Sequence, residues 1–349
     1  DIGLPHGAVT IAEALKTRGY ATACFGKWHL GYKPPWLPPD QGFDEFRGLA
    51  SGDGDYHTQV SRWGAEDWWR NNQVEPELGY TTDLLTRHSI DFIERHREKP
   101  FFLYLPHLTI HFPWQGPDDP PHRKAGKNYS RDKWGIIPNP ANVAPHVKAM
   151  IETLDRSVGE IVAALKKQNP DRQTLVIFTS DNGGYLSYGK DFHKISSNGV
   201  LRGQKGGLHE GGHRVPMIAS WPGKIRPGES AAVGHSTDFM PTLAAMAKAD
   251  LTRLELDGVD LAPVLFSGQP LPEHILFWRA GKLRAVRQGP WKLYCIKDHH
   301  ILYNLDDDIG EVHNLAPKHP DRLKAIVASL EKWEQDVDSS AFRSLGRKE

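Results

Sequence analysis

A helical pattern followed by a short apolar strand occurs three times between residues 10 and 180 of this 349-residue chain. The strands are expected at residues 20–25, 101–105 and 175–179. The helices that precede them are expected just before Gly19, at residues 81–97 and at residues 144–167. Apolar strands that alternate with helices predict an α/β fold, with a mostly parallel sheet sandwiched by helices.

The pattern changes after about Gly268. A strand at residues 215–221 and a helix at 237–247 come before that point, and residues 116–145 read as a long surface loop. The later part contains short runs separated by turns, namely ILFWR, LRAVRQ, WKLYCI and ILYNL, and then a helical pattern over residues 320–337. We therefore expect two domains, an α/β domain over residues 1–268 and an antiparallel sheet with a closing helix over residues 269–349.

The composition excludes several classes of function. Lys plus Arg and Asp plus Glu both number 43, so no basic stripe indicates a nucleic-acid partner. The sequence has no apolar run long enough to predict a membrane span. The two cysteines, Cys24 and Cys295, are too few for a disulfide framework or a four-thiolate zinc cluster, and both are expected to be buried apolar residues.

Unusual polar residues follow each of the three predicted strands. They are Lys27 and His29 after the first strand, His107 and His111 after the second, and Asp181 and Asn182 after the third. Ligands bind at the carboxyl ends of the strands in an open α/β sheet, and adjacent parallel strands would bring these residues to one edge. The pattern indicates a ligand site.

Each cluster also has a purely structural explanation. Lys27 and His29 suit a solvated turn, His107 suits a packed structural histidine, and Asp181 with Asn182 before two glycines suits an Asx turn. The coincidence of all three clusters at strand ends favours the functional interpretation.

A fourth polar cluster, LRGQKGGLHEGGHRVP, lies at residues 201–216. Its five glycines allow a close approach to a ligand, but Lys205 is followed by Gly206, which does not match a Walker A loop. Carboxylate and amide oxygens suit Ca²⁺ or Mg²⁺, and lysines beside such an ion would surround an oxyanion. A histidine near the bridging oxygen could protonate a leaving group. A sulfate or phosphate ester fits such a site.

Together these motifs carry a resemblance to a known family. The segments GKWHLG at residues 26–31, TIHFP ending at Pro113, SDNGG at residues 180–184 and the glycine-rich cluster are similar to those of the sulfatases of the alkaline-phosphatase-like superfamily. GPWKLY at residues 289–294 adds to the match, which covers nearly the whole chain. The chain resembles arylsulfatases and N-acetylgalactosamine-6-sulfatases most. The resemblance implies the alkaline-phosphatase-like fold.

The resemblance also implies a role for each candidate residue. Asp181 and Asn182 would bind Ca²⁺, with Mg²⁺ as the second choice, and Lys27 and Lys205 would hold the sulfate oxygens. His29 would assist the hydrated nucleophile, His111 would protonate the departing alcohol, and His107 would lie at the substrate rim. Glu210 and Arg214 would brace the glycine-rich loop. The substrate would be a sulfated small molecule or glycan, and the setting periplasmic or extracellular, or lysosomal in a eukaryote.

Two features of the family are not found in this sequence. Sulfatases make a formylglycine from a Cys or Ser in a C/S-x-P/A-x-R segment, and neither Cys24 nor Cys295 lies in one. The first strand of the family, which ends in two aspartate metal ligands, is also missing. We expect an N-terminally truncated sulfatase that by itself binds Ca²⁺ poorly and turns over little substrate. The alternatives are a phosphodiesterase or phosphonate hydrolase of the same superfamily and a catalytically inactive protein that binds sulfated glycans.

Overall fold

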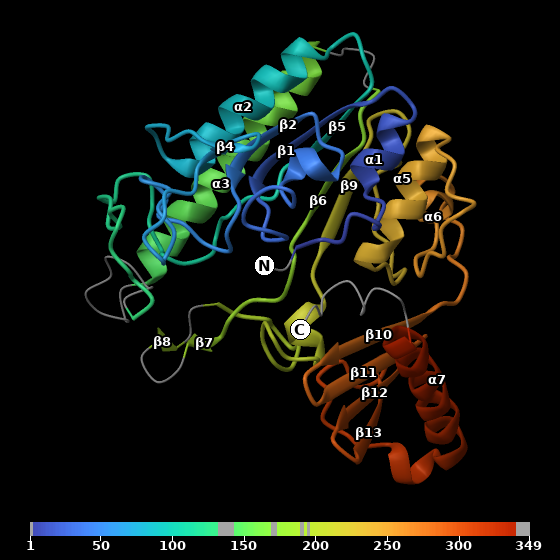
Figure 1. Ribbon diagram of the computed structural model, residues 1–349. Coiled ribbons are helices and arrows are strands. Elements are labelled where there is room, and N and C mark those ends of the chain that lie inside the picture. The colour runs from blue at the N-terminus through green and yellow to red at the C-terminus, as the bar shows by residue number, and fades with distance from the viewer. Residues whose placement is uncertain (1–2, 132–142, 169–172, 189–191, 194–195, 340–349) are drawn as a thin grey trace. The chain divides into compact units, whose positions relative to one another are not determined.

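The computed structural model describes residues 3–131, 143–168, 173–188, 192–193 and 196–339. The chain forms two compact units, the first made of residues 1–174 and 239–256 and the second of residues 175–238 and 257–349 (Figure 1). The domain boundary expected at residue 268 is a different division of the chain and stays a prediction. Among the described helices, none combines the length and the apolar character that crossing a bilayer requires.

The first unit is built on a five-stranded sheet. Its strands, in the spatial order β4-β3-β2-β1-β5, are β4 (Gln73–Val74), β3 (Trp69–Arg70), β2 (Glu45–Leu49), β1 (Ala21–Lys27) and β5 (Phe101–Tyr104). The three longer strands are parallel, with β1 between β2 and β5, and the short β3–β4 hairpin adds an antiparallel edge. The expected mostly parallel sheet is confirmed. Of the predicted loop after residue 116, residues 132–142 lie outside the described residues.

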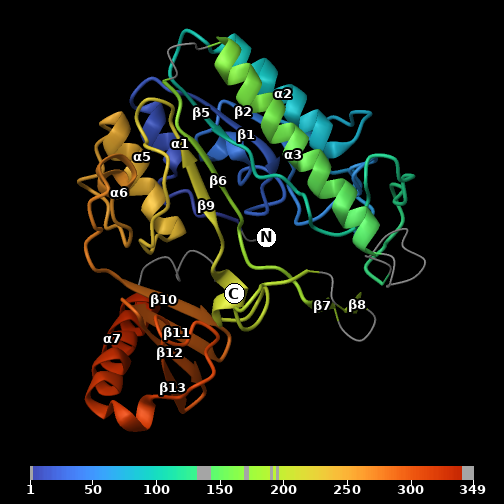
Figure 2. The ribbon, with the colours of Figure 1, turned by 180° about the vertical axis from the view of Figure 1, so that it is seen from behind.

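Helices cover both faces of this sheet. They are α1 (Ile11–Lys16), α2 (Thr81–Arg95), α3 (Val143–Gln168) and α5 (Phe239–Ala247). Figures 1 and 2 show α2 and α3 side by side along one face, with α1 and α5 together on the other. Successive residues of β1 therefore pack in opposite directions: Cys24 joins Ala12 of α1 in one cluster, and the Phe25 ring meets Phe92 of α2 edge to face at 5.8 Å. Burial on both faces is the reason why this strand is mostly apolar.

The second unit begins with β6 (Val176–Thr179), which pairs with β9 (Met217–Ser220) in an antiparallel sheet of two strands. Hydrogen bonding thus corrects the expectation that this third strand is a parallel neighbour of the first two. An apolar run indicates burial, and it carries no information about strand direction. Between β6 and β9 lie the short helix α4 (Glu210–His213) and the strands β7 (Ser187–Tyr188) and β8 (Phe192–His193). We call residues 180–184 the aspartate turn and residues 201–209 the glycine loop.

The predicted antiparallel sheet with a closing helix is confirmed at the end of the second unit. The strands, each paired with the next, are β10 (Ile275–Ala280), β11 (Leu283–Gln288), β12 (Trp291–Ile296) and β13 (His299–Asn304); the helices are α6 (Ala262–Ser267), before the sheet, and α7 (Pro320–Ser339). Apolar residues of the sheet pack on Ile326 and Leu330 of α7, and the Phe277 ring stacks on Trp333 at 5.1 Å. Both cysteines are free and buried, as expected, and burial raises the pKa of each thiol.

A buried carboxylate holds two loops of the first unit together. Asp55 is fully buried and accepts hydrogen bonds from the backbone N–H groups of His57, Thr58, His122 and Arg123, each at 2.9 Å. Burial by itself raises the pKa of Asp55, but these hydrogen bonds outweigh it, so the pKa is lower than that of an ordinary aspartate.

Replacing Asp55 with asparagine is expected to lower the free energy of unfolding by about 3 kcal/mol at pH 7, because an amide nitrogen would face buried N–H donors. The depressed pKa means that the contribution of Asp55 is complete above about pH 4 and is lost as the pH falls through the folded-state pKa. Urea unfolding at pH 7 and pH 3 measures this difference, which should shrink in acid. As a control, Asp250→Asn changes an exposed aspartate that caps Thr252 and should leave stability nearly unchanged. Equal effects of the two substitutions would contradict the prediction.

Candidate functional site

The residues predicted from the first two strands belong to the first unit, at the carboxyl ends of β1 and β5. These strands are parallel neighbours, so the segments that follow them leave the same edge of the sheet. The backbone N–H of Lys27 donates to the carbonyl of Pro106 at 2.8 Å. The structure therefore brings the segment of Lys27 next to the segment that carries His107 and His111.

Two glycines allow the backbone to pack closely where Lys27 leaves the sheet. Gly26 and Gly48 are paired in register between β1 and β2, and both have positive φ, 142° and 146°. A Cβ on Gly26 would lie 2.1 Å from the carbonyl oxygen of Pro106, and one on Gly48 would lie 2.0 Å from that of Gly26. Any larger residue at either position would displace the strand end that presents Lys27.

His29 is held by the segment that follows β2. It has a left-handed backbone (φ 57°), which is uncommon for a residue other than glycine, and its N–H donates to the carbonyl of Ala50 at 3.1 Å. Its ring lies against Gly52, where a Cβ would come within 2.6 Å of Nε2, and its centroid is 6.2 Å from that of Tyr32. Gly52 therefore helps to fix the imidazole, a role that the sequence did not indicate. Strained backbone of this kind is common at functional sites.

The His111 ring is oriented by its own backbone. Its Nδ1 lies 2.9 Å from the carbonyl oxygen of Phe112, a geometry in which Nδ1–H donates to that oxygen. The carbonyl of His111 in turn accepts a hydrogen bond from the Tyr56 hydroxyl at 3.0 Å. Because Nδ1 is engaged in this hydrogen bond, Nε2 is the ring nitrogen that proton transfer to or from a ligand would use.

His107 lies in a different environment. Its Nε2 is 3.5 Å from the Ser157 hydroxyl of α3, and its Nδ1 is buried without a hydrogen-bond partner among the described residues. Burial lowers the pKa of His107 to about 4, so the ring is neutral at pH 7. This environment favours a packing role, and contact of His107 with a substrate stays a prediction.

In the second unit, the aspartate turn and the glycine loop form one hydrogen-bonded assembly. The N–H of Gly183 donates to the carbonyl of Gly212 in α4 at 3.0 Å. The N–H of Lys205 donates to the carbonyl of Gly184 at 3.2 Å. The structure therefore brings Lys205 to the turn that contains Asp181 and Asn182.

Asn198 is the centre of this assembly. Its side-chain amide donates to the carbonyl oxygens of Gly184, Gly203 and Gly211 at 3.1, 3.0 and 2.9 Å, and its Oδ1 accepts from the N–H of Gly184 at 3.0 Å. One side chain thus links the turn, the loop and α4. Nothing in the sequence pattern distinguishes this asparagine from an ordinary loop residue.

Close packing requires glycine at three positions in this assembly. A Cβ on Gly183 would lie 2.0 Å from the carbonyl oxygen of Gly211, and one on Gly212 would lie 2.1 Å from that of Gly207. A Cβ on Gly211 would meet two carbonyl oxygens at 2.6 Å. At these three positions the backbone segments approach one another, and a close approach of the glycine loop to a ligand stays a prediction.

The side chains presented by this assembly suit an anion beside a hard cation. Asp181 is exposed, Asn182 and Lys205 are half-buried, and the Asn182 amide contacts the Asp181 carboxylate. The Lys205 ammonium lies 5.7 Å from the centre of the Tyr185 ring. Among the described residues, no carboxylate forms an ion pair with Lys205, so its charge is not neutralised by such a partner.

The donor set matches Ca²⁺ in chemistry and only in part in number. One carboxylate and one amide oxygen are ligands that Ca²⁺ prefers, but Ca²⁺ takes about six to eight oxygens. Within the part of the chain that the structure describes, no group of three or more His, Cys, Asp or Glu side chains could hold a metal ion. Asp181 and Asn182 therefore fit one part of a calcium site.

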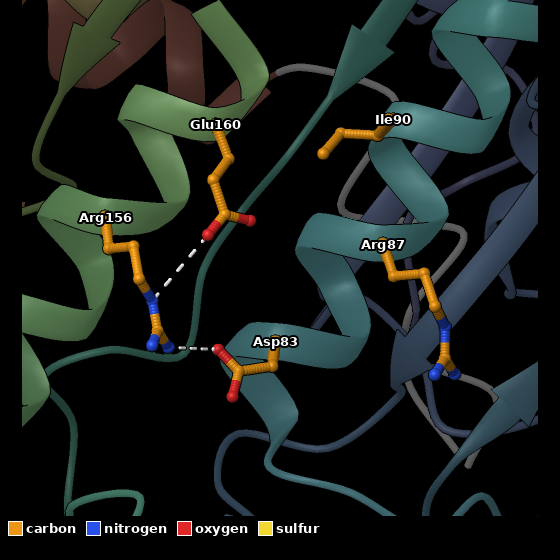
Figure 3. Close-up of a pocket in the computed structure, with 5 residues that line it drawn as sticks. All are labelled: Asp83, Arg87, Ile90, Arg156 and Glu160. Atoms are coloured by element: carbon orange, nitrogen blue, oxygen red, sulfur yellow. Dashed lines mark hydrogen bonds and ion pairs between the residues drawn. The ribbon is translucent and has the colours of Figure 1, made fainter. Parts of the chain in front are cut away.

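A surface hollow of about 390 Å³ between α2 and α3 is separate from these candidates. Figure 3 shows its lining, in which Arg156 forms ion pairs with Asp83 at 2.6 Å and with Glu160 at 3.8 Å. The remaining lining residues are Arg87 and Ile90, and none of the predicted site residues is among them. Exposed ion pairs of this kind contribute little to stability or binding.

Comparisons with known proteins agree with the motifs. The family model described as Sulfatase matches residues 2–249. Arylsulfatase A of Bos taurus is 30% identical over 93% of this chain and 71% of the relative, and N-acetylgalactosamine-6-sulfatase of Mus musculus is 30% identical over 84% and 55%. The solved structure of Ps i-CgsB in complex with k-i-k-neocarrahexaose has a TM-score of 0.82 and 30% identity, and the match covers 96% of this chain and 76% of that one.

Proposed function

We propose that this chain, which belongs to the sulfatase family, acts as a sulfuric ester hydrolase on aryl or carbohydrate sulfate esters, in a Ca²⁺-dependent site. The observation that carries the proposal is the joining of Lys205 to the turn of Asp181 and Asn182 by backbone hydrogen bonds. This arrangement anchors the backbone of a cationic residue to the turn that carries two hard oxygen donors, and the binding of a sulfate ester requires such a cation near such donors.

In the proposed site, the chain's own residues bind the sulfate and move a proton. Lys27 and Lys205 would hold non-bridging sulfate oxygens, and Asp181 and Asn182 would supply oxygen ligands to Ca²⁺. When bound, Ca²⁺ would offset the negative charge of the sulfate. A formylglycine would supply the nucleophile, as the family resemblance implies.

The two histidines would handle protons. His111 would donate a proton from Nε2 to the departing alcohol, while the Phe112 carbonyl holds the other ring nitrogen. His29 would assist the nucleophile from a position fixed by the backbone near Gly52. His107 would contact the substrate at the rim through its Nε2 side.

Carbohydrate sulfates are the substrate class that we favour. The names of the relatives include an N-acetylgalactosamine-6-sulfatase, and a structural neighbour was solved with a neocarrahexaose. We also propose a periplasmic or extracellular setting, or a lysosomal one in a eukaryote, because polymeric sulfated glycans are found outside the cytoplasm.

Hydrolysis of nitrophenyl sulfate and nitrophenyl phosphate by the protein made from its whole coding sequence tests the function. We expect a preference for the sulfate ester that is lost on chelation, and a fall in kcat/KM of at least about 10²-fold for Lys27→Ala, His111→Ala and Asp181→Ala. Preference for phosphate would favour a phosphodiesterase or phosphonate hydrolase. Binding of sulfated glycans without turnover, insensitive to chelators, would favour an inactive binding protein.

A further inference from the structure

Three charged side chains are completely buried beside the glycine loop. Lys292 of β12 is 0% exposed, and its ammonium lies 2.8 Å from Oε1 of Glu210 and 2.9 Å from Oε1 of Glu311. Glu210 begins α4, and Glu311 follows β13, so the cluster joins segments about 80 to 100 residues apart in sequence. Charged residues are rarely buried without partners, and here each is paired.

Further cations surround the carboxylate of Glu210. Its Oε2 lies 3.3 Å from Arg214 at the end of α4 and 3.3 Å from Arg287 of β11. Burial by itself raises the pKa of Glu210, but Lys292 and the other cations outweigh burial and lower it. Glu210 is therefore ionised at neutral pH, and its charge is balanced by Arg214 and by Lys292 and Arg287 of the C-terminal sheet.

The same cluster fixes the backbone of the glycine loop. Oε2 of Glu311 accepts a hydrogen bond from the N–H of Glu210 at 2.7 Å, and the carbonyl of Glu311 accepts one from Arg202 at 2.7 Å. The carbonyl of Arg202 accepts a hydrogen bond from the N–H of Gly211 at 2.7 Å. The carbonyl of Gly212 accepts one from the N–H of Gly183 in the aspartate turn. Hydrogen bonds thus connect the ionic cluster to the glycine loop and to α4, next to the place where the turn, the loop and α4 meet.

A stability role alone does not explain this arrangement. Replacing a buried ion pair with apolar residues of similar volume is often neutral or stabilising, because desolvation of the charges offsets their attraction. Charges do, however, impose distances and directions that apolar contacts do not. The cluster is therefore better suited to setting geometry than to adding stability.

We propose that Glu210, Lys292 and Glu311 are positioning residues for the glycine loop: they hold Lys205 and the aspartate turn in one fixed arrangement. The inference rests on the proposed function only for the identity of the anion. Loss of the Glu210 charge would leave Lys292 short of one partner and would release α4, which is a single turn. Lys205 and the turn would then lose their shared support.

The experiment compares Glu210→Gln with the matched control Glu334→Gln. Glu334 of α7 also lies near two cations, Arg279 at 3.6 Å and Arg284 at 3.5 Å, and among the described residues no hydrogen bond or ion pair joins it to the glycine loop. Amide hydrogen exchange of peptides covering residues 181–187 and 196–214 measures how readily the backbone hydrogen bonds of the turn and the loop open. Inhibition by inorganic sulfate and kcat/KM for nitrophenyl sulfate measure its function, and thermal unfolding measures stability.

For Glu210→Gln we expect exchange about tenfold faster in both peptides, and a loss of sulfate affinity and of kcat/KM by about 10- to 100-fold. Glu334→Gln should change none of the three. Unchanged exchange in Glu210→Gln, faster exchange without loss of sulfate affinity, or equal effects in Glu334→Gln would overturn the proposal.

Lys205→Ala separates this proposal from the proposed function. If Lys205→Ala abolishes turnover while Glu210→Gln behaves as wild type, the positioning role is wrong and the function stands. If the wild-type protein does not hydrolyse sulfate esters, the function is wrong, and exchange in the two peptides together with inorganic sulfate affinity still decides the positioning role.

Discussion

Replacing Lys205 with alanine is expected to lower kcat/KM for a sulfate ester by about 10³-fold and to leave the melting temperature within about 2 °C of wild type. A cationic donor aimed at the oxyanion stabilises charge in the transition state, and loss of one such donor costs about 10²- to 10³-fold. The fold should persist because the loop is held by the backbone N–H of Lys205 and by Asn198, which the substitution leaves in place.

Two controls accompany Lys205→Ala. Lys224→Ala removes an exposed lysine of the same unit and should leave turnover unchanged. Lys205→Arg keeps the charge but changes the shape and number of donors, so it should recover only part of the activity. Steady-state kinetics and the inhibition constant of inorganic sulfate are the measurements. Turnover within threefold of wild type in Lys205→Ala would show that the anion binds elsewhere.

Gly183→Ala is expected to be the most disruptive single-methyl change in the second unit. Its Cβ would lie 2.0 Å from the carbonyl oxygen of Gly211 and 2.9 Å from the carbonyl carbon, so α4 and the aspartate turn must separate by about 1 Å. We expect the free energy of unfolding to fall by about 3 kcal/mol. Affinities for Ca²⁺ and inorganic sulfate should fall at least tenfold, because Asn198, which joins the aspartate turn to the glycine loop of Lys205, also bonds the displaced Gly211.

Gly228→Ala is the matched control for Gly183→Ala. No heavy atom lies within 4 Å of a Cβ at Gly228, and its φ is not in the left-handed region, so the extra methyl group has space. Denaturant unfolding and isothermal titration with Ca²⁺ compare the two variants. If Gly183→Ala binds and unfolds like Gly228→Ala, the close packing of turn and helix described above is wrong.

The elements with strong periodicity could be predicted from the sequence. The helical pattern over residues 144–167 became α3, and the alternating runs after residue 275 became β10 to β13. The clusters after β1 and β5 meet at one edge because parallel neighbours end on the same side. These outcomes depend on local pattern and on rules of connection, both of which a single sequence carries.

Other features depend on contacts between distant segments and could not be predicted. The strand β2, with Glu45 and Arg47 in a sequence of five residues, lacks the apolar run that marked its neighbours. Lys292 lies in a strand pattern where a lysine normally faces solvent, and its burial follows from Glu210 and Glu311. Asn198 likewise acquires its role only when three backbone carbonyls converge on it.

The buried cluster has a consequence for dissecting this protein into parts. After Gly268 the sequence changes from alternating helices and strands to short strands separated by turns. This change suggests dividing the chain there into two separate parts. Such a cut would leave Glu210 without Lys292 and Arg287, and would expose a carboxylate whose neutralising partners had gone with the other fragment. The C-terminal sheet thus supplies cations that balance Glu210 beside the glycine loop. A chimera in which this sheet is replaced must therefore keep Lys292, Arg287 and Glu311.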